Sequence, residues 1–191
     1  PHVISPKKHF DTLLYTGNNN TSQNITGLEF QPDLVWVKNR DNVERHHLVD
    51  SVRGNNKVLM TNVTDGERTG SHGGGHTQLN LASDGFNLVS NGTNDELNFG
   101  TRTYVAWCWK AGGAAVTNND GSITTQVSAN QEAGFSIMTY TGTGSAGTCG
   151  HGLGKVPEVI ITKRRDGSGE WTIYHKDLDH SSSTNHRVIR F

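Results

Sequence analysis

The sequence predicts an all-β protein, built as an antiparallel β-sandwich of the jelly-roll type. Only 32% of the 191 residues are hydrophobic while 23 are glycine, a composition that favours short strands and polar turns over a helical bundle. The apolar runs are short and bounded by turn-forming residues, as strands are. The sequence also repeats itself, which indicates a duplicated structural unit.

The repeat consists of two pairs of segments at a constant separation. Phe10–Gly17 returns as Phe135–Gly142, and Gly27–Asp41 returns as Gly152–Asp166, each 125 residues later. The second copy has no counterpart of Tyr104–Lys110, so the sequence is expected to be a stretch of a longer protein. Repeated modules more often serve surface binding or assembly than a single catalytic centre.

The repeat and the composition divide the chain into four expected parts. Residues 1–9 are predicted to form an extended lead-in and residues 10–112 a β-sandwich module. Residues 113–132 are rich in Gly, Asn and Thr and are predicted to be a linker. Residues 133–191 are expected to form a second, partial copy of the module. Alternatively they complete the sheets of one sandwich, because a partial module leaves sheet edges unpaired.

Ten short segments have the pattern of strands. They are Thr12–Tyr15, Leu34–Lys38, His46–Val49, Lys57–Met60, Phe86–Val89, Tyr104–Lys110, Phe135–Tyr140, Val159–Lys163, Glu170–Tyr174 and Arg187–Phe191. The runs at 34–38 and 159–163 are continuously apolar, which predicts central strands buried on both faces. Pro32 and Pro157 precede them, where a missing N–H does not interrupt a ladder.

The tryptophans are the candidate ligand-binding residues. In the run 104–110 the strand period of two places Trp107 and Trp109 on one face. The first interpretation of this pair is as anchors of the core or of sheet packing. The alternative is a platform for sugars, since an aromatic face packs against the apolar face of a pyranose. Trp36 is the third candidate, in an earlier predicted strand.

Other reactive residues do not form a recognisable catalytic or metal-binding pattern. His72 and His76 flank three glycines, but a zinc site needs three or four ligands in fixed geometry, and a polar loop is the favoured interpretation. Cys108 and Cys149 are expected to be free thiols. Without a Gly-x-Ser-x-Gly elbow or a phosphate-binding loop that opens a helix, we expect no catalytic residues, metal or cofactor.

Charge and hydropathy exclude two classes of partner. The formal net charge is −1, which gives no electrostatic argument for binding nucleic acid. No apolar run approaches the roughly 20 residues that a membrane span requires.

Several phrases of the sequence resemble a family of repeat-bearing virion proteins of tailed bacteriophages, especially marine and cyanobacterial ones. They are Tyr15–Gly17, Phe30–Arg40, Asp50–Gly54, Ser83–Phe86, Tyr104–Gly113 and His151–Gly154. The resemblance implies lectin-like β-sandwich modules of the concanavalin or laminin-G kind. It also implies a structural protein on the surface of the phage particle, in the tail, a fibre or a head decoration, with other virion proteins as partners. Phage fibres are commonly trimers, so a homo-oligomer is expected, although no heptad run encodes one.

Three functions are therefore expected, in order of preference. The first is a non-enzymatic virion protein that acts in assembly and touches the host surface. The second is a carbohydrate-binding adhesion module, which needs an exposed aromatic side chain or a calcium ion held by loop carboxylates. The third is a glycan depolymerase, which needs paired acids in a cleft.

Overall fold

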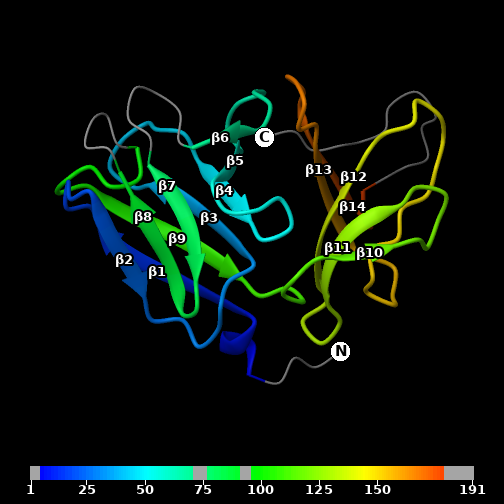
Figure 1. Cartoon of the computed structure of the whole chain (residues 1–191), viewed down its shortest axis with the longest axis horizontal. Coiled ribbons are helices and arrows are strands. Elements are labelled where there is room, and N and C mark those ends of the chain that lie inside the picture. Colours follow the sequence, from blue (N-terminus) through cyan, green and yellow to red (C-terminus); the bar gives the residue numbers. More distant parts are fainter. Residues whose placement is uncertain (1–4, 71–76, 91–95, 179–191) are drawn as a thin grey trace.

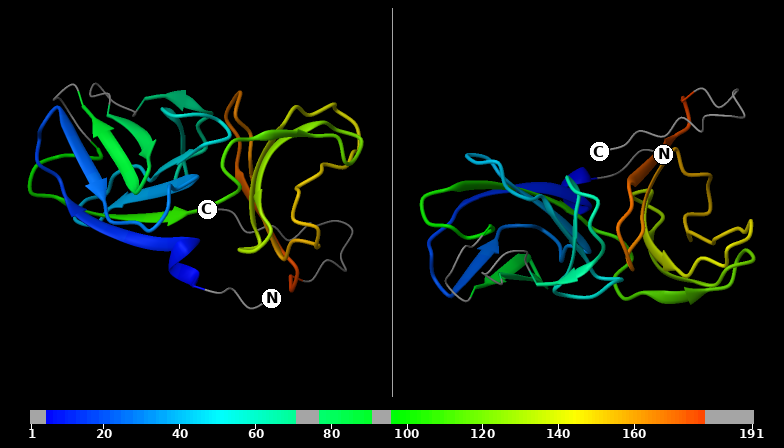
Figure 2. Two further views of the ribbon diagram at one scale, coloured as in Figure 1. Left: turned by 60° about the horizontal axis from the view of Figure 1, so that its bottom comes forward. Right: turned by 90° about the horizontal axis from the view of Figure 1, so that it is seen from above.

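The structure is a computed structural model, and it describes residues 5–70, 77–90 and 96–178. It consists of strands and one short 3-10 helix, η1 (Pro6–Lys8). Its two halves lie side by side, one before and one after about residue 112 (Figures 1 and 2). The prediction of an all-β sandwich is confirmed.

The first half is a two-layered sandwich. Its strands are β1 (Phe10–Thr16), β2 (Ser22–Thr26), β3 (Leu34–Asn39), β4 (His47–Asp50), β5 (Lys57–Met60), β6 (Arg68–Thr69), β7 (Gln78–Ala82), β8 (Gly85–Val89) and β9 (Thr103–Trp109). One sheet has the order β1-β9-β3-β4-β5-β6 and the other β2-β8-β7, and every pair is antiparallel. Strand β9, the last in sequence, therefore lies between β1 and β3.

The hydrophobic core fills the space between these two sheets. It includes Val35 and Val37 of β3, Tyr104 of β9, and Phe86 and Leu88 of β8. Along β3 and β9 every second residue is buried, because successive side chains of a strand point to opposite faces. The prediction that the run 34–38 is buried on both faces was wrong, since only its inner face packs against the second sheet.

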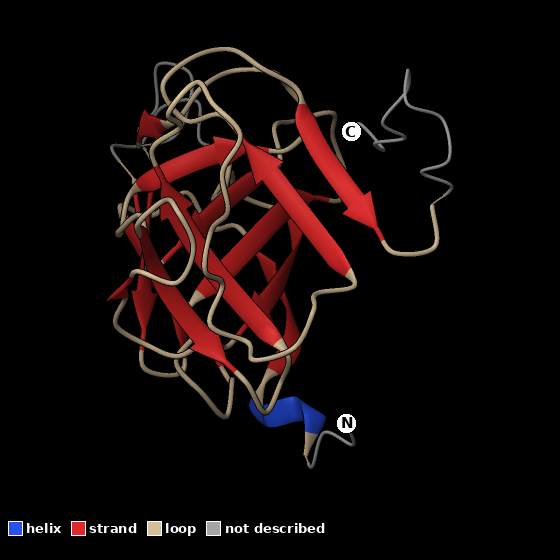
Figure 3. Cartoon of the chain, turned by 90° about the vertical axis from the view of Figure 1, so that its right-hand side faces the viewer, coloured by secondary structure: helices blue, strands red, loops and turns tan. Residues whose placement is uncertain are grey.

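The second half contains two smaller sheets. Strands β10 (Val116–Asn118), β11 (Thr125–Asn130) and β12 (Phe135–Tyr140) form one, and β13 (Val159–Lys163) and β14 (Trp171–His175) form the other. Among the described residues, no strand of this half pairs with a strand of the first half. The described part of the second half therefore does not complete the sheets of the first sandwich. The predicted strand Arg187–Phe191 lies outside the described residues. Figure 3 turns this half toward the viewer.

The predicted linker needs correction. Residues 113–132 contain β10 and β11, and β11 pairs with β12 along its whole length. The polar composition hid the alternation of this segment, in which Thr125 and Val127 are buried and Gln126 is exposed. A strand needs only one apolar face when a single side of its sheet is covered.

The described part of the lead-in is not extended as predicted. Pro6 opens η1, and the His9 N–H donates to the Pro6 carbonyl over 2.9 Å. Proline suits the first helical position because its fixed φ is already helical. The His9 side chain is buried, and its Nδ1 lies 3.0 Å from Asn130 Nδ2 at the end of β11. This segment therefore contacts the second half.

Candidate functional site

The outer face of the six-stranded sheet carries an aromatic surface. We call it the outer aromatic face and define it by Phe10, Leu14, Trp36, Trp107 and Trp109. The strand register sets Trp107 opposite Trp36 and Trp109 opposite Phe10. The ring centroids of Trp36 and Trp107 are 5.3 Å apart, and those of Phe10 and Trp109 are 4.9 Å apart. Neighbouring strands thus place their aromatic rings in contact across the sheet.

This face is open to solvent to a considerable degree. Leu14 is 65% exposed and Phe10 39%, and the three tryptophans are half-buried. Of the interpretation of Trp107 and Trp109 as anchors of the core or of sheet packing, the part that placed them in the core was wrong. The inner face of β9 is taken by Tyr104, Ala106 and Cys108, all fully buried, so the period of two turns the tryptophans outward.

The tryptophan rings are held in place by neighbours. Trp36 Nε1 donates to Thr61 Oγ1 over 3.1 Å. The Trp109 ring lies against Phe10 and, at 6.2 Å between centroids, against Phe135 of β12. Phe10 and Phe135 occupy equivalent positions in the two repeats. Rings held in this way form a firm apolar surface that suits a protein partner or the face of a sugar.

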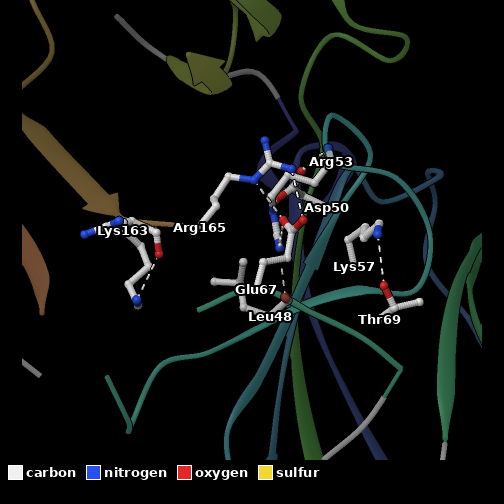
Figure 4. Close-up of polar contacts among 9 residues, drawn as sticks. Leu48, Asp50, Arg53, Lys57, Glu67, Thr69, Lys163 and Arg165 are labelled. Carbon is white, nitrogen blue, oxygen red and sulfur yellow. Dashed lines mark hydrogen bonds and ion pairs between the residues drawn. The ribbon is translucent and has the colours of Figure 1, made fainter. Parts of the chain in front are cut away.

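A second cluster joins the halves through ion pairs (Figure 4). We call it the junction cluster and define it by Asp50, Arg53, Glu67 and Arg165. Glu67 accepts two hydrogen bonds from Arg165, at 2.9 and 3.0 Å, and one from Arg53 at 3.3 Å. Arg53 also donates to Asp50 and to the Leu48 carbonyl. Side chains from both halves therefore meet at one carboxylate.

Backbone contacts reinforce this junction. The Glu67 N–H donates to the Arg165 carbonyl over 2.7 Å, and Trp171 Nε1 of β14 donates to the Met60 carbonyl over 3.0 Å. A Cβ on Gly66 would lie 2.8 Å from the Arg165 carbonyl oxygen, so only glycine allows this close approach. The β13–β14 hairpin is thus fixed to the first half by its turn and by the first residue of β14.

The charge of Glu67 should make this junction sensitive to acid. Burial opposes ionisation of Glu67, but the hydrogen bonds and charges of Arg165 and Arg53 outweigh it and hold its pKa below the ordinary value of 4.5. A group with a depressed folded-state pKa stabilises the protein above its unfolded pKa and loses that contribution as the pH falls through the folded value. We expect the free energy of unfolding to fall between pH 5 and pH 3 less steeply in Glu67→Gln than in the wild type. The free energies are measured by denaturant titration at each pH. An equally steep fall with pH in the two proteins would contradict this expectation.

A third cluster lies at the end of the first sandwich. His47 is fully buried, with its Nε2 2.9 Å from Glu96 Oε2, and Arg45 Nη1 lies 2.7 Å from Glu96 Oε1. Burial opposes ionisation of Glu96, but the bonds and charges of His47 and Arg45 lower its pKa. The other ring nitrogen of His47, Nδ1, is buried without a hydrogen-bond partner among the described residues. Because His47 is closed off from solvent, the arrangement suits structural pairing rather than catalysis.

The remaining candidates carry little chemistry. Cys108 and Cys149 are free, as predicted, and burial raises the pKa of Cys108 to about 12. In the described ranges no three His, Cys, Asp or Glu residues group as metal ligands; His72 and His76 lie outside them. A cavity of about 670 Å³ lies beside the loop 148–157, and Asp120 is the single carboxylate among the residues that line it.

The fold and this surface define the class of protein: an all-β protein with an exposed aromatic sheet face. Residues 5–189 match the family described as Domain of unknown function (DUF7483), and the chain belongs to that family. No curated protein and no solved structure was found to match it. In the described part of the chain, no helix is both long and apolar enough to cross a membrane.

Proposed function

We propose that this protein is a non-enzymatic structural subunit of a bacteriophage particle, and that its outer aromatic face binds another protein subunit. The single observation that carries the proposal is the exposure of that face, where Phe10, Leu14 and three tryptophans lie together on one side of a sheet. Contiguous exposed apolar side chains are typical of interaction surfaces. The sequence resemblance to repeat-bearing virion proteins supports the setting in a phage tail, fibre or head decoration.

The composition of the face favours a protein partner. Tryptophan and phenylalanine are enriched at the centres of protein interfaces, where they lose water on binding. Rings already held by Thr61 and by neighbouring rings lose little conformational entropy on association. The partner to be tested is a second copy of this chain, because a homo-oligomer is the expected assembly.

Leu14→Lys should disrupt that assembly. Leu14 is 65% exposed, so the substitution leaves the core intact and places a charge on the apolar face. We expect the wild type to self-associate with rising concentration in sedimentation velocity, and Leu14→Lys to weaken association at least tenfold, about 1.4 kcal/mol. The matched control is Val43→Lys, a fully exposed apolar residue in the loop between β3 and β4. A wild type that stays monomeric, or equal association of the three proteins, would count against the proposal.

A carbohydrate-binding module is the second candidate, favoured by the half-exposed pair Trp36 and Trp107. A glycan array distinguishes it from the first. Reproducible binding by the wild type that is lost in Trp107→Ala would assign the face to glycan recognition. The depolymerase has no comparable support, because the cavity beside the loop 148–157 has one carboxylate in its lining rather than two.

A further inference from the structure

A polar pocket lies between the β11–β12 ladder and the turn of the β13–β14 hairpin. It has a volume of about 250 Å³, and we define it by five of the residues that line it, Thr124, Gln126, Thr139, Thr141 and Arg165. Its volume equals that of roughly eight water molecules at about 30 Å³ each, which is enough for one hexose unit. The pocket borders the junction cluster, because Arg165 belongs to both. Ligand sites are common where structural units meet.

The strand register places four of these side chains on one face of the sheet. Gln126 of β11 is directly opposite Thr139 of β12. Thr124 and Thr141 continue the same face just beyond the ladder, because side chains alternate along a strand and the intervening residues point to the other face. Gln126 and Thr141 are exposed. Arg165 reaches the pocket from the β13–β14 turn, so side chains from two sheets converge there.

These groups offer both hydrogen-bond donors and hydrogen-bond acceptors. The Gln126 amide donates once to Thr117 Oγ1 over 3.0 Å, which leaves its carbonyl oxygen and a second N–H for a ligand. Within the described residues no hydrogen bond satisfies the hydroxyl of Thr139 or of Thr141, and each hydroxyl can donate one bond and accept two. The hydroxyl groups of a sugar also donate and accept, whereas an anion only accepts. The pocket therefore matches a sugar better than an anion.

The positive charge of the pocket is already compensated. Arg165 is the single charged residue among those that line it, and its Nε and Nη2 donate to Glu67 over 2.9 and 3.0 Å (Figure 4). A guanidinium carries five N–H groups, so three remain for a ligand. Because the carboxylate of Glu67 lies against the guanidinium, an acidic ligand gains little electrostatic attraction over a neutral one.

Several of these side chains are held before a ligand arrives. Thr124 Oγ1 donates to Asn119 Oδ1 over 3.1 Å, and the bonds described above hold Gln126 and Arg165 in place. Side chains that are fixed in this way lose less conformational entropy when they bind a ligand.

We propose that the polar pocket binds a neutral sugar, one hexose unit of a saccharide, through the hydroxyl groups of the sugar. The threonine hydroxyls and the Gln126 amide supply donors and acceptors, and Arg165 supplies further N–H groups. The site is separate from the outer aromatic face, and the proposal does not depend on the role of that face.

The test is an NMR titration of the full chain of 191 residues with the methyl glycosides of glucose, galactose and mannose. We expect at least one of them to shift the Gln126 side-chain amide signal and the backbone amide signals of Thr139 and Thr141, with saturation in the millimolar range. Gln126→Ala and Thr141→Val should each weaken binding about threefold or more, because each removes groups that bond to the sugar.

The repeat provides the control. Thr16 precedes Thr141 by the repeat separation of 125 residues and does not line the pocket, so Thr16→Val makes the same chemical change without affecting binding. Circular dichroism of each variant checks that the fold is retained. Sodium glucuronate and inorganic phosphate are titrated in parallel to test the preference for a neutral ligand.

The outcomes separate the polar pocket from other sites. Binding of a neutral glycoside that Gln126→Ala and Thr141→Val weaken and Thr16→Val leaves unchanged supports the proposal. Tighter binding of glucuronate or phosphate than of any neutral glycoside would identify an anion site and overturn it. The absence of saturable shifts, equal binding by all variants, or shifts confined to the indole signals of Trp36 and Trp107 would overturn it as well.

Discussion

Tyr15→Ala is expected to destabilise the protein by about 3–5 kcal/mol, the cost of removing a large aromatic side chain from a packed core. Tyr15 stacks on Tyr104, meets the edge of Phe86 at 5.9 Å between centroids, and donates from its hydroxyl to the Leu97 carbonyl over 2.9 Å. All of these contacts are lost at once. In a thermal melt the midpoint should fall by about 6–20 °C.

The repeat provides the matched control. Tyr140→Ala makes the same chemical change at the corresponding position, where the side chain is 48% exposed. Surface substitutions away from special features usually stay within about 0.5 kcal/mol, so the melting temperature should barely move. Similar losses in the two variants would mean that the second repeat already buries its tyrosine.

Arg53→Ala is the second substitution with a large expected effect, about 3–5 kcal/mol, because it leaves a buried charge without its partner. The Arg53 side chain is 3% exposed and that of Asp50 is 5% exposed. Removal of the guanidinium takes a hydrogen bond from the Leu48 carbonyl and from both carboxylates of the junction cluster. Chemical denaturation followed by tryptophan fluorescence measures the loss.

Arg68→Ala serves as the comparison for this substitution. Arg68 pairs with Asp65 over 2.8 Å, but both side chains are about two-fifths exposed, and exposed ion pairs contribute about 0–1 kcal/mol. If Arg53→Ala is no more harmful than Arg68→Ala, then Asp50 finds another partner or water, and the junction cluster contributes little to stability.

Strands with a clear alternation of side chains could be predicted from the sequence. The predicted bounds of Lys57–Met60, Phe135–Tyr140 and Val159–Lys163 agree with the structure, and Tyr104–Lys110 is shifted by one residue. These segments succeed because apolar and β-branched residues are concentrated between turn formers. Strands β2 and β11 were missed, since polar residues occupy the face of each that is turned to solvent.

Burial was harder to predict than strand position. Leu34–Lys38 and Val159–Lys163 have similar apolar content, yet Val35 is fully buried and Ile160 is 37% exposed. Val35 belongs to the core between the two sheets and Ile160 does not, and local sequence does not encode which face of a strand another sheet will cover. The same holds for the candidate site: the tryptophans were identified, but whether Trp107 faces the core depends on what Tyr104 and Ala106 meet on the other side of β9.

The central place of β9 also determines how the chain folds during synthesis. Strand β9, which pairs with both β1 and β3, emerges only after residue 103, roughly 60 residues after the end of β3, so the ribosome needs about 3–12 s to deliver it. Through that interval the growing chain exposes two unpaired edges, a state prone to wrong associations. Chaperone demand during translation should therefore be greatest just before β9 appears.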